Sequence, residues 1–87
     1  ESANVRNSLV ANGCVIRGSV ENSIIFRGVT IEEGAEIKNS IVMQKTHVKE
    51  DALLENVICD KNVVIQKEKW LKGAANYPLI ITKNTVV

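Results

Sequence analysis

The chain has 87 residues, which is the size of one small domain. Eleven Lys and Arg residues nearly balance ten Asp and Glu residues and leave a net charge of +1, so no basic excess indicates a nucleic-acid surface. No apolar run approaches the roughly 20 residues that a membrane-spanning helix needs. Two cysteines without a motif spacing are typical of a cytosolic protein. We therefore expect one cytoplasmic domain with neither a nucleic-acid nor a membrane partner.

Four similar stretches divide the chain into repeats: NSLV, NSII, NSIV and NVIC. Their first residues, spaced by 15, 17 and 17 positions, are Asn7, Asn22, Asn39 and Asn56. Six columns around each asparagine hold apolar or small residues, arranged as three triplets of a small, a variable and an aliphatic residue. In the third repeat these columns contain Ala35, Ile37, Ser40, Val42, Thr46 and Val48. A repeat of this kind decides the whole fold, so it takes precedence over local propensities.

Each triplet predicts a short β-strand, because successive side chains of a strand point to opposite faces. In chain order the predicted strands are residues 3–5, 8–10, 14–16, 18–20, 23–25, 29–31, 35–37, 40–42, 46–48, 52–54, 57–59 and 63–65. Three strands and three bends make one turn of a triangular coil, and coils stacked about 4.8 Å apart pair their strands in parallel. The sequence therefore predicts an all-β, single-stranded parallel β-helix of about four to five triangular coils.

Turn residues mark the corners of these coils, in motifs such as ANG, RG, EEG and DK. Asn and Gly suit corners where φ must be positive. The first coil is two residues short between Ile16 and Gly18, which predicts a tightened corner there. The columns resemble the hexapeptide-repeat pattern, and that resemblance implies a left-handed coil. General crossover preferences alone favour a right-handed one.

The end of the chain predicts an incomplete fifth coil after an insertion. The segment LIITKNTVV fits two further strands, at residues 79–81 and 85–87, which follow their counterparts by 22 positions instead of 17. We place an irregular insertion near residues 68–78, where a glycine and a proline interrupt regular structure. Lys69 stands where a small inward residue belongs. We therefore expect the third side of coil four to be irregular and Trp70 to cover the apolar end of the stack.

One outward column is entirely aliphatic. On the side of the coil that begins at each repeated asparagine, the outward residues are Leu9, Ile24, Ile41, Ile58 and Ile80. Phe26 and Met43 flank this column. Exposed aliphatic residues also suit an ordinary β surface, but five in register form the kind of patch that monomers avoid. We predict that these seven residues form an interface with another domain or subunit.

No arrangement of residues indicates an active site. His47 is the only histidine, which excludes a three-histidine zinc site, and we expect a solvated outward residue that nothing orients. Cys14 and Cys59 fall in inward columns about 14 Å apart, too far for a disulfide, so we expect reduced core residues. We expect no catalytic residue, no metal ligand and no cofactor in this segment.

Three arginines lie at or beside the predicted corners, and they are Arg6, Arg17 and Arg27. Guanidinium groups suit an anionic ligand, so these are our candidate effector-binding residues. The alternative is that they are solvated surface residues.

The chain resembles the C-terminal β-helix of bacterial glucose-1-phosphate adenylyltransferase in the stretch NSLVANGCVIRGSVENSIIFRGVTIEEGAEIKNSIVMQ, followed by VICDKNVVI and a closing strand. The tail KWLKGAANYPLIITKNTVV is more similar to the regulatory, GlgD-type subunit than to the catalytic one. The resemblance covers essentially all of residues 1–87. It implies one domain of a longer chain, whose N-terminal nucleotidyltransferase domain and Mg²⁺-binding aspartates are absent here.

That resemblance implies an oligomerisation and regulatory domain, not catalytic by itself. It would assemble an enzyme that makes ADP-glucose for glycogen biosynthesis. The implied partners are its own N-terminal catalytic domain and catalytic glucose-1-phosphate adenylyltransferase subunits in an oligomer, with effectors bound near the junction between domains.

Two other functions fit the repeats. Hexapeptide-repeat acyltransferases are trimers that use one histidine as a general base, which would place His47 in a cleft between subunits. Loss of acyl-CoA turnover in His47→Ala would identify that function. A structural β-helix from another sugar-nucleotide transferase has the same columns, and only the sequence upstream would distinguish it.

Overall fold

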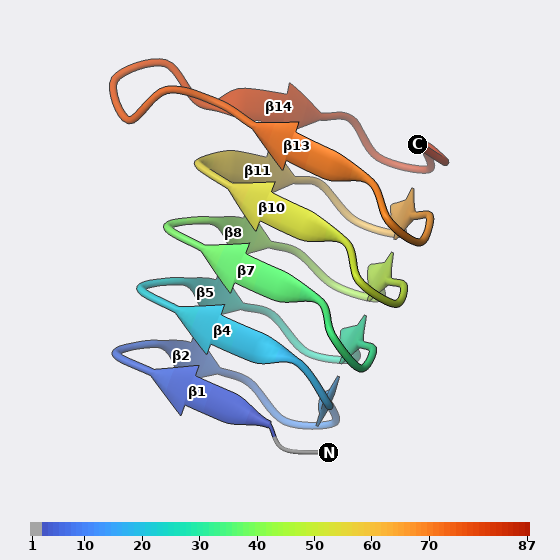
Figure 1. The fold of residues 1–87 in the computed structure, drawn as a ribbon. Coiled ribbons are helices and arrows are strands. Elements are labelled where there is room, and N and C mark those ends of the chain that lie inside the picture. The colour runs from blue at the N-terminus through green and yellow to red at the C-terminus, as the bar shows by residue number, and fades with distance from the viewer. Residues whose placement is uncertain (1–2) are drawn as a thin grey trace.

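The computed structural model describes residues 3–87, and within this range it contains fourteen short strands and no helix (Figure 1). The strands are β1 (Asn4–Arg6), β2 (Leu9–Val10), β3 (Val15–Ile16), β4 (Ser19–Glu21), β5 (Ile24–Ile25), β6 (Thr30–Ile31), β7 (Glu36–Lys38), β8 (Ile41–Val42), β9 (His47–Val48), β10 (Leu53–Glu55), β11 (Val57–Cys59), β12 (Val64–Ile65), β13 (Trp70–Lys72) and β14 (Leu79–Ile81). The described residues thus include no helix with the length and apolar character needed to cross a membrane.

Three parallel sheets form the sides of a triangular prism (Figure 1). Sheet A has the strand order β1-β4-β7-β10-β13, sheet B has β14-β11-β8-β5-β2, and sheet C has β12-β9-β6-β3. One coil therefore contributes one strand to each side. In Figure 1 the near strands run to the left and the far strands to the right as the chain rises from the N-terminus, which makes the coil left-handed. The predicted left-handed parallel β-helix is confirmed.

The register of the sheets confirms the inward columns. On sheet A the inward residues that pair from coil to coil are Val5, Val20, Ile37, Leu54 and Leu71. The fully buried apolar residues of the three sheets and their corners are Val20, Ile25, Val29, Ile31, Ala35, Ile37, Val42, Val48, Ala52, Leu54, Val57, Cys59, Val63 and Ile65. Each middle coil is covered by its two neighbours, whereas Val5 and Val10 in the first described coil stay 44% and 38% exposed. Burial therefore depends on stacking, as in other solenoids.

The repeated Asn-Ser pair builds the corner between sheets A and B. The asparagines have φ between 50° and 57°, the left-handed region that Asn enters more readily than most residues, and they are Asn7, Asn22, Asn39 and Asn56. In the first three repeats the residue that follows is a serine that faces inward, and in the fourth it is Val57. The Ser40 hydroxyl donates a hydrogen bond to the Lys38 carbonyl at 2.7 Å and accepts one from the Val57 N–H at 3.1 Å. Asn thus makes the turn, and Ser satisfies backbone groups that the corner buries.

The tightened corner of the first coil depends on Gly18. Val15 pairs with Thr30, an offset of 15 residues, whereas later coils repeat every 17. A Cβ atom at Gly18 would lie 2.3 Å from the carbonyl oxygen of Ala35. Only glycine lets the shortened chain pass this close to the next coil, so the prediction of a tight corner is confirmed.

The fourth coil is more regular than the sequence predicted. In β13, Leu71 pairs with Leu54 in the 17-residue register, so the third side of this coil is not irregular. The five extra residues lie after the strand, where residues 73–78 form a loop that contains a bridge between Ala74 and Tyr77. The insertion is therefore confined to the corner between sheets A and B.

The expectation that Trp70 covers the apolar end of the stack is wrong. Trp70 pairs with the outward Leu53 and is itself 72% exposed on the side of the prism. The expectation failed because it treated Lys69 as a break in the pattern. Lys69 is exposed in the last coil of sheet A, where a long side chain can reach water without displacing the strand.

Candidate packing surface on sheet B

The aliphatic column of sheet B is in register across all five coils. Direct pairs join Leu9 to Ile24, Ile24 to Ile41, Ile41 to Ile58 and Ile58 to Ile80. Leu9 is 70% exposed, Ile24 42% and Ile80 62%. Ile41 and Ile58 are half-buried, because the side chains above and below cover part of their surface. The sheet thus presents a continuous apolar strip that runs along the prism.

The two flanking residues widen this strip towards the corner with sheet C. Phe26 and Met43 follow β5 and β8 directly, and both are half-buried. Their backbone N–H groups continue the ladder between coils, from Phe26 to the Val42 carbonyl at 2.9 Å and from Met43 to the Cys59 carbonyl at 3.0 Å. The structure therefore brings together the predicted interface residues on one face.

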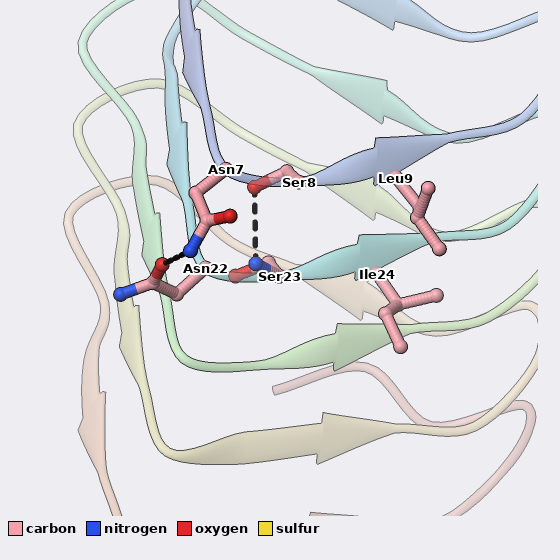
Figure 2. A pocket seen from close by; sticks show the side chains of 6 residues that line it. All are labelled: Asn7, Ser8, Leu9, Asn22, Ser23 and Ile24. Atoms are coloured by element: carbon pink, nitrogen blue, oxygen red, sulfur yellow. Dashed lines mark hydrogen bonds between the residues drawn. The ribbon is translucent and has the colours of Figure 1, made fainter.

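A hollow of about 500 Å³ lies beside the N-terminal end of the strip (Figure 2). Leu9 and Ile24 project from neighbouring strands on the same side, and the asparagine corner borders them (Figure 2). The Asn7 side-chain amide donates a hydrogen bond to the side-chain oxygen Oδ1 of Asn22, and the Ser23 N–H donates one to the Ser8 hydroxyl at 3.0 Å. These bonds join the first two coils at the edge of the strip.

Sheet A has a different outer surface. The residue at the C-terminal end of each strand of sheet A points outward, and these residues alternate in charge along the prism. They are Arg6, Glu21, Lys38, Glu55 and Lys72. Arg6 lies 3.6 Å from Glu21, and Lys72 lies 3.9 Å from Glu55. Such exposed pairs contribute little stability, but they leave no apolar strip on this side.

The three candidate effector arginines do not come together. Arg6 belongs to the charged column of sheet A, and Arg17 forms an ion pair with Glu32 at 2.9 Å beside sheet C. Arg27 lines a groove at the corner between sheets B and C, and Arg6 and Arg17 line two other, separate hollows. The three arginines therefore lie apart, and none of these hollows is lined by more than one of them.

The groove at this corner is a basic site that sequence reasoning missed. It has a volume of about 730 Å³, and its lining residues are Asn12, Gly13, Arg27, Gly28, Gln44, Lys45, Lys61, Asn62, Lys83 and Asn84. No carboxylate is among them. Its basic residues recur at the same corner in four successive coils, so a comparison of this corner between coils reveals the cluster, whereas only Arg27 is among the effector candidates named from the sequence.

His47 is oriented by an acid, contrary to the prediction. Its Nε2 atom lies 2.8 Å from Oε2 of Glu32, and Arg17 binds the other oxygen of the same carboxylate. The hydrogen bond from His47 has the largest effect and lowers the pKa of Glu32. Desolvation opposes it, and the Arg17 guanidinium lowers the pKa further, so the pKa stays below its ordinary value. The three side chains link three coils on the outside of sheet C. Among the described residues, no group of three or more His, Cys, Asp or Glu side chains could hold a metal ion.

Both cysteines are unpaired, as predicted. Burial raises the pKa of the Cys59 thiol to about 12, so it stays protonated and unreactive at neutral pH. Cys14 is half-buried and its Sγ donates a hydrogen bond to the Phe26 carbonyl at 3.0 Å. They are core residues and do not form a redox site.

Residues 1–72 match the family described as GlmU-like, C-terminal hexapeptide. Over 82 residues the chain is 60% identical to the Glycogen biosynthesis protein GlgD of Bacillus subtilis (strain 168), which covers 94% of this chain and 24% of the relative. It is 55% identical over 83 residues to the protein of the same name from Geobacillus stearothermophilus, covering 95% of this chain and 24% of the relative. A glucose-1-phosphate adenylyltransferase of Bacillus thuringiensis (strain Al Hakam) is 51% identical over 37 residues, which are 42% of this chain and 10% of that protein. The chain thus spans about a quarter of the length of the two GlgD relatives.

Proposed function

The chain belongs to the GlmU-like C-terminal hexapeptide family, and we propose that it is the β-helix module of a glycogen-biosynthesis protein, in which sheet B packs against another domain or subunit. The relatives' names support this pathway, since two are named glycogen biosynthesis proteins and one a glucose-1-phosphate adenylyltransferase. In this proposal the module assembles and regulates the enzyme and does not itself catalyse nucleotidyl transfer.

The aliphatic strip is the observation that carries the proposal. The fold does not require it, because sheet A builds the same parallel ladder with a column of alternating charges. Five aliphatic residues in register, two of them more than 60% exposed, form a surface that favours a partner. Their burial would contribute about 5–10 kcal/mol before the cost of association, since some are already half-covered.

The partners that we propose are an N-terminal catalytic domain of the same protein and catalytic glucose-1-phosphate adenylyltransferase subunits. The chain matches about a quarter of its GlgD relatives, which leaves room for such a domain. In this proposal Mg²⁺ acts in that catalytic domain.

Regulation has a separate candidate site in the basic groove between sheets B and C. Arg27, Lys45, Lys61 and Lys83 form no ion pair with another described residue, and the groove that they line contains no carboxylate. We propose that this groove binds an anionic, phosphate-bearing effector. Calorimetric titration with inorganic pyrophosphate should give binding that Lys61→Ala weakens and Lys67→Ala, at another corner, does not. Equal affinities would contradict this assignment.

The packing proposal is tested by mixing the chain with the catalytic glucose-1-phosphate adenylyltransferase of Bacillus thuringiensis and measuring complex mass by sedimentation equilibrium. The wild-type chain should form a complex, and Ile41→Asp should weaken it at least about tenfold, because a carboxylate would be buried in an apolar interface. Lys38→Asp, on sheet A, should bind as the wild type does.

Equal binding by both variants would contradict packing through sheet B. A trimer of the chain alone that Ile41→Asp does not change, with acyl-CoA turnover that His47→Ala abolishes, would instead support the acyltransferase. That rival has one observation in its favour, the Glu32–His47 pair.

A further inference from the structure

Sheet A carries an exposed tryptophan that neither the core nor the strip on sheet B accounts for. Trp70 is the only tryptophan of the chain and is 72% exposed. It lies in the outward column above Leu53 and Glu36, which precede it on the two coils below. Large aromatic residues on a surface are most common where another protein binds.

A groove of about 330 Å³ lies beside this column. Its lining residues are Gly34, Glu36, Asp51, Ala52, Leu53 and Trp70. Asp51 sits at a corner with φ of 61°, and its carboxylate lies against Gly34, where a Cβ atom would be only 2.0 Å from Oδ1. Glycine at this position therefore leaves room for the carboxylate beside the groove.

The two carboxylates of the groove are available to a ligand. Asp51 forms no side-chain hydrogen bond or ion pair with another residue of the described range 3–87. Glu36 lies 3.8 Å from Lys38, and both side chains are about half exposed, so water already weakens that pair. No cation lines the groove itself.

We propose that this groove on sheet A binds an arginine side chain presented by a partner protein. An indole face attracts a cation, and arginine is the cation that most often stacks on one. The planar guanidinium can lie against Trp70 while its N–H fork reaches the carboxylates of Asp51 and Glu36. Leu53 supplies an apolar surface for the methylene groups of the side chain.

Charge complementarity favours this occupant over a neutral or an anionic one. The groove offers only hydrogen-bond acceptors in its charged side chains, which suits a group that only donates. The whole chain carries a net charge of +1, so a basic peptide is not attracted by the overall charge of the molecule. This site is on a different sheet from the aliphatic strip, and it does not depend on the function proposed above.

The test uses the fluorescence of Trp70, which is the only tryptophan and therefore reports on the groove alone. Titration with an end-blocked tetraarginine peptide should change the emission in a saturable way. Asp51→Asn should weaken binding about fivefold, because it removes one charge-assisted contact at an exposed site. Glu55→Gln removes a charge from the same sheet outside the groove and should leave the affinity unchanged. Trp70→Ala, followed by calorimetry, should lose most of the binding.

Tetralysine and maltotriose are the matched probes. Tetralysine should bind at least about fivefold more weakly than tetraarginine, since an ammonium group lacks the planar fork. Equal affinity for the two peptides, or equal losses in Asp51→Asn and Glu55→Gln, would reduce the effect to nonspecific charge and overturn the proposal. An emission change with maltotriose that persists in high salt, without one from tetraarginine, would assign the groove to a carbohydrate instead.

Discussion

Sheets A and B share one architecture and differ in their outer surfaces. Both are five-stranded, parallel and in register. One of the two outward columns of sheet A alternates between basic and acidic residues, in the order Arg6, Glu21, Lys38, Glu55 and Lys72. That of sheet B is aliphatic throughout, in the order Leu9, Ile24, Ile41, Ile58 and Ile80.

This difference distinguishes the residues that the fold requires from the residues that it leaves free to vary. The inward residues of both sheets are equally buried in the middle coils, so the core explains the stacking. The outward residues can be charged or aliphatic without changing the ladder. The fold therefore does not explain the aliphatic strip. Substitutions of inward residues should change stability, and substitutions in the strip should mainly change binding to a partner.

The largest effect is expected inside the prism. Ile37→Asp, on sheet A, would place an unpaired carboxylate at a position that is 0% exposed. Burying an unpaired carboxyl group costs several kcal/mol even when it becomes protonated, and with the lost aliphatic contacts this is comparable with the roughly 5–15 kcal/mol that stabilises a typical domain. The variant should lose its β-type circular dichroism and its cooperative urea transition. A folded Ile37→Asp would show that the inward columns are assigned incorrectly.

Ser40→Ala tests the corner that joins the two sheets. It removes the acceptor of the buried Val57 N–H and should lower the free energy of unfolding by about 1–3 kcal/mol in urea denaturation. Ser8→Ala removes the corresponding acceptor of the Ser23 N–H in the exposed first coil. Water can replace the hydroxyl there, so the loss of stability should be smaller. The two variants should therefore differ clearly, and equal losses would count against the serine ladder as a buried network.

A smaller effect is expected from the charged column. Lys38→Glu would create three acidic residues on successive coils of sheet A, with Glu21 and Glu55 as neighbours. The unfolding free energy should fall by about 0.5–1 kcal/mol at low salt, and added salt should reduce the loss. Lys38→Gln is the neutral control. A loss that salt does not change would mean that the charges of the column do not interact.

The smallest effect concerns Glu32 on sheet C, and it depends on pH. Its pKa is lowered in the folded protein, first by the hydrogen bond from His47. The ionised form therefore stabilises the fold above the pKa of the unfolded chain, and this stability disappears as pH falls through the folded pKa. The stability of Glu32→Gln should approach that of the wild type in acid. Glu50→Gln, an exposed neighbour, controls for lost charge. If the difference in unfolding free energy between the wild type and Glu32→Gln grew on acidification, a lowered pKa of Glu32 in the folded protein would be contradicted.

The sequence predicted the coil and the core because both follow from a period of about 17 residues. Each column repeats one environment, so Val42 and Cys59 can be assigned together. The aliphatic strip was predicted for the same reason. It needs no knowledge of side-chain conformation.

Contacts between different columns could not be predicted in this way. The Glu32–His47 hydrogen bond joins a corner residue to a strand residue 15 positions later, a diagonal that comparison within columns does not detect. The sequence does not predict the groove beside Trp70, because no further strand of sheet A lies above β13 to enforce the pattern and Lys69 therefore resembles an irregularity. Contacts at the end of the stack and contacts between different columns depend on side-chain positions, which the period of the sequence does not determine.

Equilibrium urea unfolding of Ile41→Asp tests most directly whether the strip on sheet B serves assembly and not folding. Ile41 points outward on β8, next to the inward Val42. Replacing it should lower the unfolding free energy by only about 1–2 kcal/mol, through lost contacts with Ile24 and Ile58, with the cooperativity of the transition unchanged. If Ile41→Asp instead loses its cooperative transition, as Ile37→Asp should, the strip is part of what holds the fold together and the account is wrong.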